Sequence, residues 1–449
     1  MRRVYALAVA AAAVLVGMGG ASSAGQGQAA ATETSVGPAL IAADKTGRYA
    51  VAWPETESTP TSNPPGETIN ERRFAVMFGP IESAKRVVRH IIVPPDRDPS
   101  PYFAIALDRH GRAVLSWIDY ASNRPIDMSP HRLSMVRVDR AGHVIPVGRF
   151  DGAYENVKIA TTPTGHVIAV ASKSNRVFIS TLRRSGNQFT GPRPLASPAR
   201  LPGHRGSING PELRLTGHNF ATVLWSETYY PDSLSRVRVR IQKIGFTGAR
   251  IGPTRTLEPP PNDDQANGLL WYDGYRDREA ITWIQGERRF TNWMRTGPAG
   301  HLRTKLPLKG IDAGTKLALS PSGRVFVIGA KYGPIRNRAH EQDTIVVAGW
   351  VGHNGLRHPR VLARARYIDP SEWFALRALR GGTPVALWSD GHRRARLHAA
   401  TLSTANRVLR STALRLSGLD LSDAVALDGH RVLVVLTSKR HIRIRLLHL

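Results

Sequence analysis

The sequence predicts an all-β fold, a β-propeller of seven or eight four-stranded blades, of which we favour eight. Three observations predict it. A glycine turn followed by an apolar strand recurs along the chain, each repeat contains four strand-like runs, and no helical periodicity follows the N-terminal segment. A twisted four-stranded sheet cannot bury both of its faces alone, whereas blades set radially around an axis cover each other. A β-sandwich built from the same strands is the alternative.

The repeat is a glycine turn followed by an apolar strand that often ends in tryptophan. In its clearest copies Trp53 follows Gly47 and Trp117 follows Gly111. At intervals of about 45 to 65 residues, further copies begin near Gly165, Gly217, Arg278, Gly323, Gly382 and Gly429. A four-stranded unit of this length is typical of a propeller blade.

The four runs of a repeat are clearest in the sixth copy. They cover residues 316–319, 325–328, 344–350 and 356–362. The runs alternate, favour β-branched and aromatic residues, and are bounded by Gly, Pro, Asn and Asp. The eighth repeat stops at Leu449 after its third run. We expect residues around Thr32 to Val36 to supply its outer strand and close the ring.

The N-terminus has the layout of a secretory signal peptide, which we assign to residues 1–24. Arg2 and Arg3 precede an apolar run over residues 4–16, and small residues lead up to Ala24. The run is shorter than the roughly 18 apolar residues that a membrane helix needs, so no transmembrane anchor is expected. We divide the remainder into an N-terminal segment, 25–37, and a single propeller domain, 38–449. The predicted location is extracellular or in the cell envelope.

Composition limits the chemistry. The chain has no cysteine, which excludes disulfides, a lipid-modified cysteine and a thiol nucleophile. Lysine and arginine number 62 against 34 acidic residues, a formal net charge of +28. A surface this basic attracts anionic polymers such as acidic glycans or teichoic acids. The alternative is a background effect of an arginine-rich composition, because the arginines are spread along the chain. Nothing predicts specific nucleic-acid recognition, and we expect a monomer.

The long connections of the predicted blades lie on one face. In a four-stranded meander the first–second and third–fourth turns share one face, and here they are short, as at Gly47 and Gly142. The second–third connections on the opposite face are long and cover residues 54–71, 119–131, 226–235 and 331–343. Extended connections usually carry recognition. We therefore expect a binding site on that face, near the axis.

An acidic residue repeatedly follows the tryptophan of the second strand by two positions. The acids are Glu55, Asp119, Glu227 and Asp390. Residues two apart on a strand point to the same side. In one interpretation these groups form a ring that binds sugar hydroxyls or cations. In the other, the indoles pack between blades and each acid faces an arginine that opens the third strand, such as Arg132, Arg236 or Arg394.

Aromatic residues in or beside the long connections are a second group of candidates. Exposed aromatic rings stack on sugar rings or bases; the alternative is that they seal the seams between blades. They include Tyr102 and Tyr367. The candidate binding set is Glu55, Asp119, Glu227, Tyr229, Tyr230, Tyr332, Trp373 and Asp390.

No catalytic residue, metal or cofactor is assigned. The chain lacks a Gly-x-Ser-x-Gly elbow, a phosphate loop and a dinucleotide fingerprint. His340-Glu341 lacks the second histidine of a zincin helix, and the run 262–264 lacks the alternation of an EF-hand loop.

The repeat at Thr164-Gly165-His-Val-Ile-Ala-Val, followed by Asn175-Arg176-Val177, resembles the repeats of NHL-like propellers. The wider glycine-to-tryptophan pattern is similar to that of repeat proteins exported by bacteria. This resemblance implies a scaffold that binds proteins or glycans, and it assigns no catalytic residue. The expected function is a non-catalytic binding propeller that recognises a protein or an anionic envelope polymer. The alternative is a carbohydrate-active hydrolase or lyase with acidic residues at the central channel.

Overall fold

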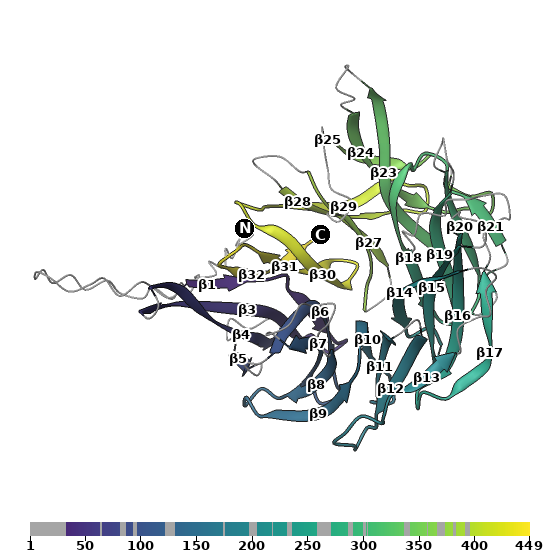
Figure 1. Cartoon of the computed structure of the whole chain (residues 1–449). Helices are drawn as coiled ribbons and strands as arrows, with labels where there is room; N and C mark the ends of the chain where they lie inside the picture. Colours follow the sequence, from purple (N-terminus) through teal and green to yellow (C-terminus); the bar gives the residue numbers. More distant parts are fainter. Residues whose placement is uncertain are drawn as a thin grey trace, which may run out of the picture.

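Eight sheets surround a common axis, which confirms the eight-bladed propeller (Figure 1). The computed structural model describes residues 33–62, 65–80, 87–92, 97–121, 131–173, 176–196, 204–217, 219–230, 236–257, 271–285, 291–299, 302, 304–335, 342–356, 358–365, 373–379, 383–390 and 396–449. Every element in these ranges is a strand or a turn, and they hold no helix long and apolar enough to cross a membrane.

Each sheet follows the order of the chain, from the innermost strand outward. The first blade contains β1 (Glu33–Val36), β2 (Leu40–Ala43), β3 (Arg48–Ser62), β4 (Pro65–Pro80) and β5 (Val87–Ile92). The second contains β6 (Arg97–Leu107), β7 (Ala113–Ala121), β8 (Arg132–Val138) and β9 (Val144–Asp151). The third contains β10 (Tyr154–Thr161), β11 (Val167–Lys173), β12 (Arg176–Leu182) and β13 (Arg193–Ala196). The fourth contains β14 (His204–Arg214), β15 (Phe220–Tyr230), β16 (Arg236–Gly245) and β17 (Arg250–Leu257).

The other four blades repeat this antiparallel meander. The fifth contains β18 (Trp271–Tyr275), β19 (Arg278–Gln285), β20 (Thr291–Pro298) and β21 (Thr304–Pro307). The sixth contains β22 (Ala313–Leu319), β23 (Val325–Ile335), β24 (Gln342–Trp350) and β25 (Arg360–Ala365). The seventh contains β26 (Trp373–Arg377), β27 (Pro384–Ser389), β28 (Arg396–Leu402) and β29 (Val408–Arg415). The eighth contains β30 (Asp420–Asp428), β31 (Arg431–Thr437) and β32 (Ile442–His448).

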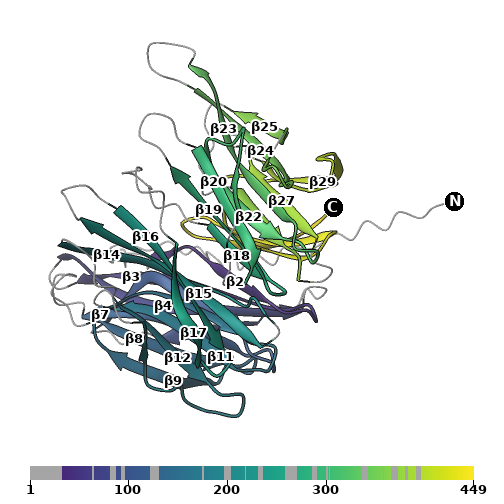
Figure 2. The same ribbon diagram turned by 90° about the vertical axis from the view of Figure 1, so that its right-hand side faces the viewer.

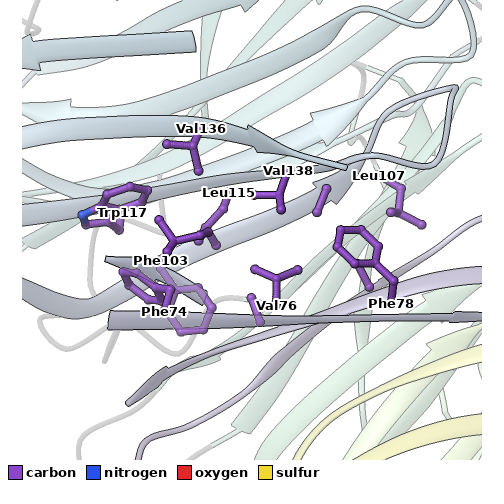
Figure 3. Packing of buried hydrophobic residues seen from close by; sticks show 13 residues of the cluster. Phe74, Val76, Phe78, Phe103, Leu107, Leu115, Trp117, Val136 and Val138 are labelled. Atoms are coloured by element: carbon purple, nitrogen blue, oxygen red, sulfur yellow. The ribbon is translucent and has the colours of Figure 1, made fainter. Parts of the chain in front are cut away.

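Apolar clusters between neighbouring blades hold the ring together. Eight clusters occur, and each combines residues of two successive blades. The alternation of β7 explains this, because Leu115 and Trp117 face the first blade while Val114 and Ile118 face the third. Figure 3 shows Trp117 packed beside Phe74, with ring centroids 5.3 Å apart. Figure 2 shows β11 and β12 running beside β15 in the neighbouring sheet.

The ring closes without a strand shared between the first and last blades. An apolar cluster joins Val51 and Trp53 of the first blade to Leu433 and Val435 of the eighth. Side chains of the eighth blade bind the backbone of the segment that leads into β2. Ser422 Oγ accepts a hydrogen bond from Ala39 N at 2.7 Å and donates one to Ala39 O at 3.0 Å. The seam therefore depends on apolar packing, on hydrogen bonds from side chains and on a backbone hydrogen bond of 2.8 Å from Val36 N to Lys439 O.

The expectation that residues near Val36 form the outer strand of the eighth blade is wrong. The strand β1 pairs with β3 of the first blade, where Val36 lies opposite Glu55. The reason is the length of β3, whose first half pairs with β2 and whose second half needs another partner for its backbone groups. The eighth blade keeps three strands.

The predicted long loops are largely strands. The segment 54–71 lies in β3 and β4, which pair as far as Ser62 and Pro65 and project together from the first blade (Figure 1). The strand β15 likewise contains residues 226–230 of the segment 226–235, and β23 and β24 contain the two ends of 331–343. Polar residues on both faces of these ladders hide the alternation that marks a half-buried strand. We call the end with these hairpins the hairpin face and the other end the short-turn face.

Truncation of a buried side chain at the closing seam should leave a cavity and destabilise the ring. Leu433 is 2% exposed within the cluster that joins the first and last blades. Truncation in Leu433→Ala should lower the free energy of unfolding by about 2 to 5 kcal/mol, measured by urea denaturation. The same change at Leu409, which is 63% exposed, should cost less than about 0.5 kcal/mol. Equal losses in the two variants would contradict this account of closure.

Candidate functional site

The first of the predicted acids is held by its own tryptophan. Trp53 Nε1 donates a hydrogen bond of 2.8 Å to Glu55 Oε1, and Arg73 Nε donates one of 2.9 Å to Oε2. The same guanidinium reaches Glu57 Oε2 at 2.9 Å. Trp53 packs in the seam between the eighth and first blades. Glu55 is therefore fixed by the third strand of its own blade, away from the axis.

Glu227 repeats this arrangement in the fourth blade. Trp225 Nε1 donates to Glu227 Oε1 at 3.0 Å, and the indole is buried against the third blade. The second carboxylate oxygen lies 3.9 Å from Arg240 Nη1. In the register of β15 and β16, Glu227 stands opposite Arg238, two residues inside the start of the third strand. The longer hairpin thus moves the acid away from Arg236.

Asp119 forms a buried ion pair in the second blade. Its carboxylate lies 3.2 Å from Arg132 Nε, and Ser134 Oγ donates to it at 2.7 Å. The side chains of Asp119 and Arg132 are 0% and 6% exposed. Removing one partner from such a pair leaves an uncompensated buried charge, which typically costs about 3 to 5 kcal/mol. The second blade therefore requires both charges together.

Asp390 has a different set of partners in the seventh blade. Its Oδ1 accepts a hydrogen bond from Arg396 N at 2.8 Å, and its Oδ2 lies 3.3 Å from His398 Nε2. His398 in turn stacks on Trp388, with ring centroids 5.3 Å apart. The imidazole lies opposite Trp388, as Arg240 lies opposite Trp225 in the fourth blade.

The structural interpretation of the tryptophan–acid pattern is correct for the indoles, which pack between blades, but of the four acids only Asp119 is seen to face an arginine that opens the third strand. The pairing with Arg132 is confirmed. Arg394 and the side chain of Arg236 lie outside the described residues. Across those residues, no group of three or more His, Cys, Asp or Glu comes close enough to bind a metal.

The predicted aromatic residues are only partly placed. Tyr332, on β23 at the hairpin face, is 44% exposed. Tyr229 and Tyr230 belong to β15 and Trp373 begins β26, but their side chains lie outside the described residues, as does that of Tyr102. Tyr367 lies wholly outside them. Their role in binding stays a prediction.

A cavity of about 320 Å³ lies among the innermost strands of the fourth to eighth blades, and the sequence analysis did not identify it. Its wall mixes charged and aromatic side chains with aliphatic ones. The charged and aromatic residues of the wall include Arg214, Trp271, Asp273, Phe374, Arg377 and Asp423. We call this space the axial cavity. A concave site with a few convergent polar groups is the usual form of a small-molecule site.

An ion pair crosses one wall of the axial cavity. Arg377 Nη1, on the seventh blade, lies 3.1 Å from Asp273 Oδ1 on the fifth and 2.6 Å from Gly274 O. Arg377 also stacks over Tyr275, with its guanidinium carbon 4.6 Å from the ring centroid. Asp273 Oδ2 accepts a hydrogen bond from Leu319 N of the sixth blade at 2.9 Å. This network fixes three innermost strands relative to each other.

Asp423, on β30 of the eighth blade, is a carboxyl group in the wall of the axial cavity. Its Oδ2 accepts a hydrogen bond from Ile41 N of the first blade at 2.9 Å, and its Oδ1 accepts one from Ala424 N at 2.8 Å. Burial raises the pKa of the Asp423 carboxyl to about 6, although both backbone hydrogen bonds and the more distant charge of Lys158 act to lower it. Asp423 thus contributes both to the closing seam and to the axial cavity.

A sequence signal for the axial cavity exists, but it is weak. Charged residues such as Arg214, Asp273, Arg377 and Asp423 interrupt first strands that are otherwise apolar or small. Isolated charges of this kind match no motif. Their convergence depends on how closely the innermost strands approach at the axis.

The raised pKa of Asp423 gives stability a defined pH dependence. The folded state binds this proton more tightly than the unfolded state does, because the pKa rises from 3.8 to about 6 on folding. The stabilisation is complete below pH 3.8 and is lost as the pH rises through about 6. Relative to Asp423→Asn, the wild type should lose up to about 3 kcal/mol between about pH 4 and pH 7.5, measured by urea denaturation.

Asp139→Asn is the control of opposite sign. The hydrogen bond from His143 lowers the pKa of Asp139, so its contribution is present above the ordinary value and is lost as the pH falls. A constant difference between wild type and Asp423→Asn over this pH range would contradict the assignment.

Solved structures of other proteins share the fold. The chain is similar to one described as "Structure of Dos1 propeller", with a TM-score of 0.52, 10% identity and coverage of 91% of this chain and 92% of that chain. The polysaccharide lyase Uly1 gives a TM-score of 0.44 at 8% identity, covering 90% and 88%. The Hadza microbial sialidase Hz136 gives 0.37 at 15%, covering 76% and 77%. No protein-family profile and no curated protein sequence matches the chain significantly. At these identities the first likeness establishes the propeller fold alone.

Proposed function

We propose that the chain is a non-catalytic binding propeller for an anionic polymer. The observation that carries the proposal is the charge balance. Basic side chains exceed acidic ones so far that a net +28 would remain if every acid were neutralised by one base. A field of this size raises the local concentration of negatively charged partners and speeds their association.

The pairing of the acids supports the same conclusion. Glu55, Asp119 and Glu227 each lie within ion-pair distance of an arginine of their own blade, which reduces their attraction for a cationic ligand. The signal-like segment at residues 1–24 would bring the propeller to the cell envelope, where acidic glycans and teichoic acids are available partners. Export and location remain part of the proposal.

The test is a salt titration of binding. The purified protein should bind an acidic polysaccharide at about 50 mM salt and lose at least tenfold in affinity by about 200 mM, because each neutralised charge releases counterions. Isothermal titration calorimetry or biolayer interferometry measures the slope, with a neutral polysaccharide of equal length as the control. An absence of binding at low salt, or equal binding to the neutral polymer, would refute the proposal.

A second candidate function is a carbohydrate-active hydrolase or lyase at the axial cavity. One observation favours it. The pKa of Asp423 is about 6, and the Asp273 carboxylate lies in the wall of the same cavity. A carboxyl with a pKa near the working pH is suited to transfer protons.

Product release discriminates between the two functions. If the cavity is catalytic, the wild type releases new reducing ends or unsaturated products from an acidic polysaccharide, and Asp423→Asn loses at least about a hundredfold in rate while it still binds the polymer. If the protein only binds, no products accumulate and Asp423→Asn binds like the wild type. Binding measured in parallel separates a failed enzyme from an unfolded one.

A further inference from the structure

One turn type recurs on the short-turn face and fixes a basic residue at its end. Asp44 Oδ1 accepts hydrogen bonds from Thr46 N at 2.8 Å and from Arg48 N at 3.1 Å. Asp108 makes the same bonds in the next blade, to His110 N at 2.8 Å and Arg112 N at 3.0 Å. The residue four positions after the acid is therefore held in place by the turn itself.

Other copies of the turn begin with a hydroxyl residue. Thr162 Oγ1 accepts a hydrogen bond from His166 N at 3.0 Å. Ser320 Oγ accepts one from Arg324 N at 3.0 Å, and Ser403 Oγ accepts one from Arg407 N at 3.1 Å. The N–H group four positions after the first residue is thus bound in both versions, while the acids also bind the N–H group two positions after them.

The two versions differ in charge. In the acidic version the carboxylate also binds the guanidinium, with Arg48 Nη2 2.6 Å from Asp44 Oδ2 and Arg112 Nε 2.7 Å from Asp108 Oδ2. A serine supplies no negative charge, so the turns at Arg324 and Arg407 hold the same cation without its carboxylate. An external carboxylate would complete there the pair that the acidic turns make internally.

Arginines of this face also lie against the turns of neighbouring blades. A Cβ on Gly165 would meet Arg109 Cδ of the second blade at 2.9 Å and Arg184 Cγ at 3.5 Å, and a Cβ on Gly323 would meet Arg278 Cδ at 2.8 Å. Both glycines have positive φ, 85° and 77°. Each glycine therefore leaves space for the side-chain carbons of an arginine from the preceding blade, and Gly165 also for those of Arg184 in its own blade. These arginines are exposed at the surface.

These observations define a set that we call the turn arginines. They are exposed, belong to five blades, and have no acid within ion-pair distance among the described residues: Arg109, Arg184, Arg278, Arg324 and Arg407. The hairpin face differs, because Arg73 there is shared between Glu55 and Glu57. Within the described residues, the short-turn face thus carries arginines that no carboxylate neutralises.

We propose that the short-turn face is the docking surface for a linear polycarboxylate glycan, which follows the turn arginines from blade to blade. The proposal rests on the proposed function and assigns it a face and a ligand class. A guanidinium can bind a planar carboxylate through two parallel N–H donors. On the acidic turns Arg48 and Arg112 already bind a carboxylate, there through the single oxygen Oδ2 of Asp44 or Asp108. The binding site expected from the long second–third connections would lie at the opposite end of the propeller, on the hairpin face.

The first test compares two matched charge reversals. Arg109→Glu/Arg324→Glu/Arg407→Glu changes the short-turn face of the second, sixth and seventh blades. Arg149→Glu/Arg364→Glu/Arg415→Glu makes the same change on the exposed outer strands β9, β25 and β29 of the same blades. Polygalacturonate is the probe, and thermal denaturation confirms folding; Arg→Gln versions replace any variant that unfolds.

The short-turn variant should lose at least about thirtyfold in affinity for polygalacturonate, and the outer-strand variant less than about fivefold, since a local site depends on contacts more than on net charge. Equal losses would overturn the docking face while leaving polyanion binding intact. No binding by the wild type would instead refute the proposed function. Binding of inorganic polyphosphate but not polygalacturonate would overturn the assignment to carboxylates.

A second test leaves every arginine in place. Ser320→Asp/Ser403→Asp converts two hydroxyl turns into the acidic version, whose carboxylate should occupy Arg324 and Arg407 and compete with the ligand. Affinity for polygalacturonate should fall about fivefold or more. The control Ser411→Asp/Thr256→Asp adds the same charge at exposed positions of β29 and β17 and should bind nearly as the wild type does. Equal effects in the two pairs would overturn the role of the turns.

Discussion

Packing between the faces of neighbouring blades is the interaction on which the whole structure depends. Each second strand alternates its side chains between two neighbours, so no blade has a core of its own. The recurrent tryptophans act in this packing, because Trp117 and Trp225 both lie against the preceding blade. Their indole positions fix where the acid two residues later must lie. The acid–base pairs at the rim therefore follow from the core.

The sequence predicts what is local and repeated. Glycine turns and alternating strands identify eight blades, and the pairing of Asp119 with Arg132 follows from the order of the strands. The place of β1 could not be predicted, because it depends on how far β3 extends beyond β2. The axial cavity could not be predicted either, since Asp273 and Arg377 are separated by an entire blade and meet only through the curvature of the ring.

The net charge of these turns on the short-turn face depends on whether the first residue of the turn is an aspartate or a serine. An aspartate or a serine as the first residue binds the N–H group four positions later, so turns of the same form occur with either one. Only the aspartate neutralises the arginine that follows. The surface potential of the short-turn face can therefore change through single substitutions that leave the blade intact, whereas the buried pair of Asp119 and Arg132 cannot change in this way.

Closure through side chains has a consequence for the order of assembly. In this propeller the first blade is complete without any residue of the last, because β1 and β2 both pair with β3. Blades can then be added one after another in the order in which the chain is synthesised or emerges from a membrane. Only the contacts of the eighth blade with the first, including those of Ser422, Asp423 and Lys439, must wait for the C-terminus. The ring is thus completed last, when the C-terminal blade packs against a first blade that has already formed.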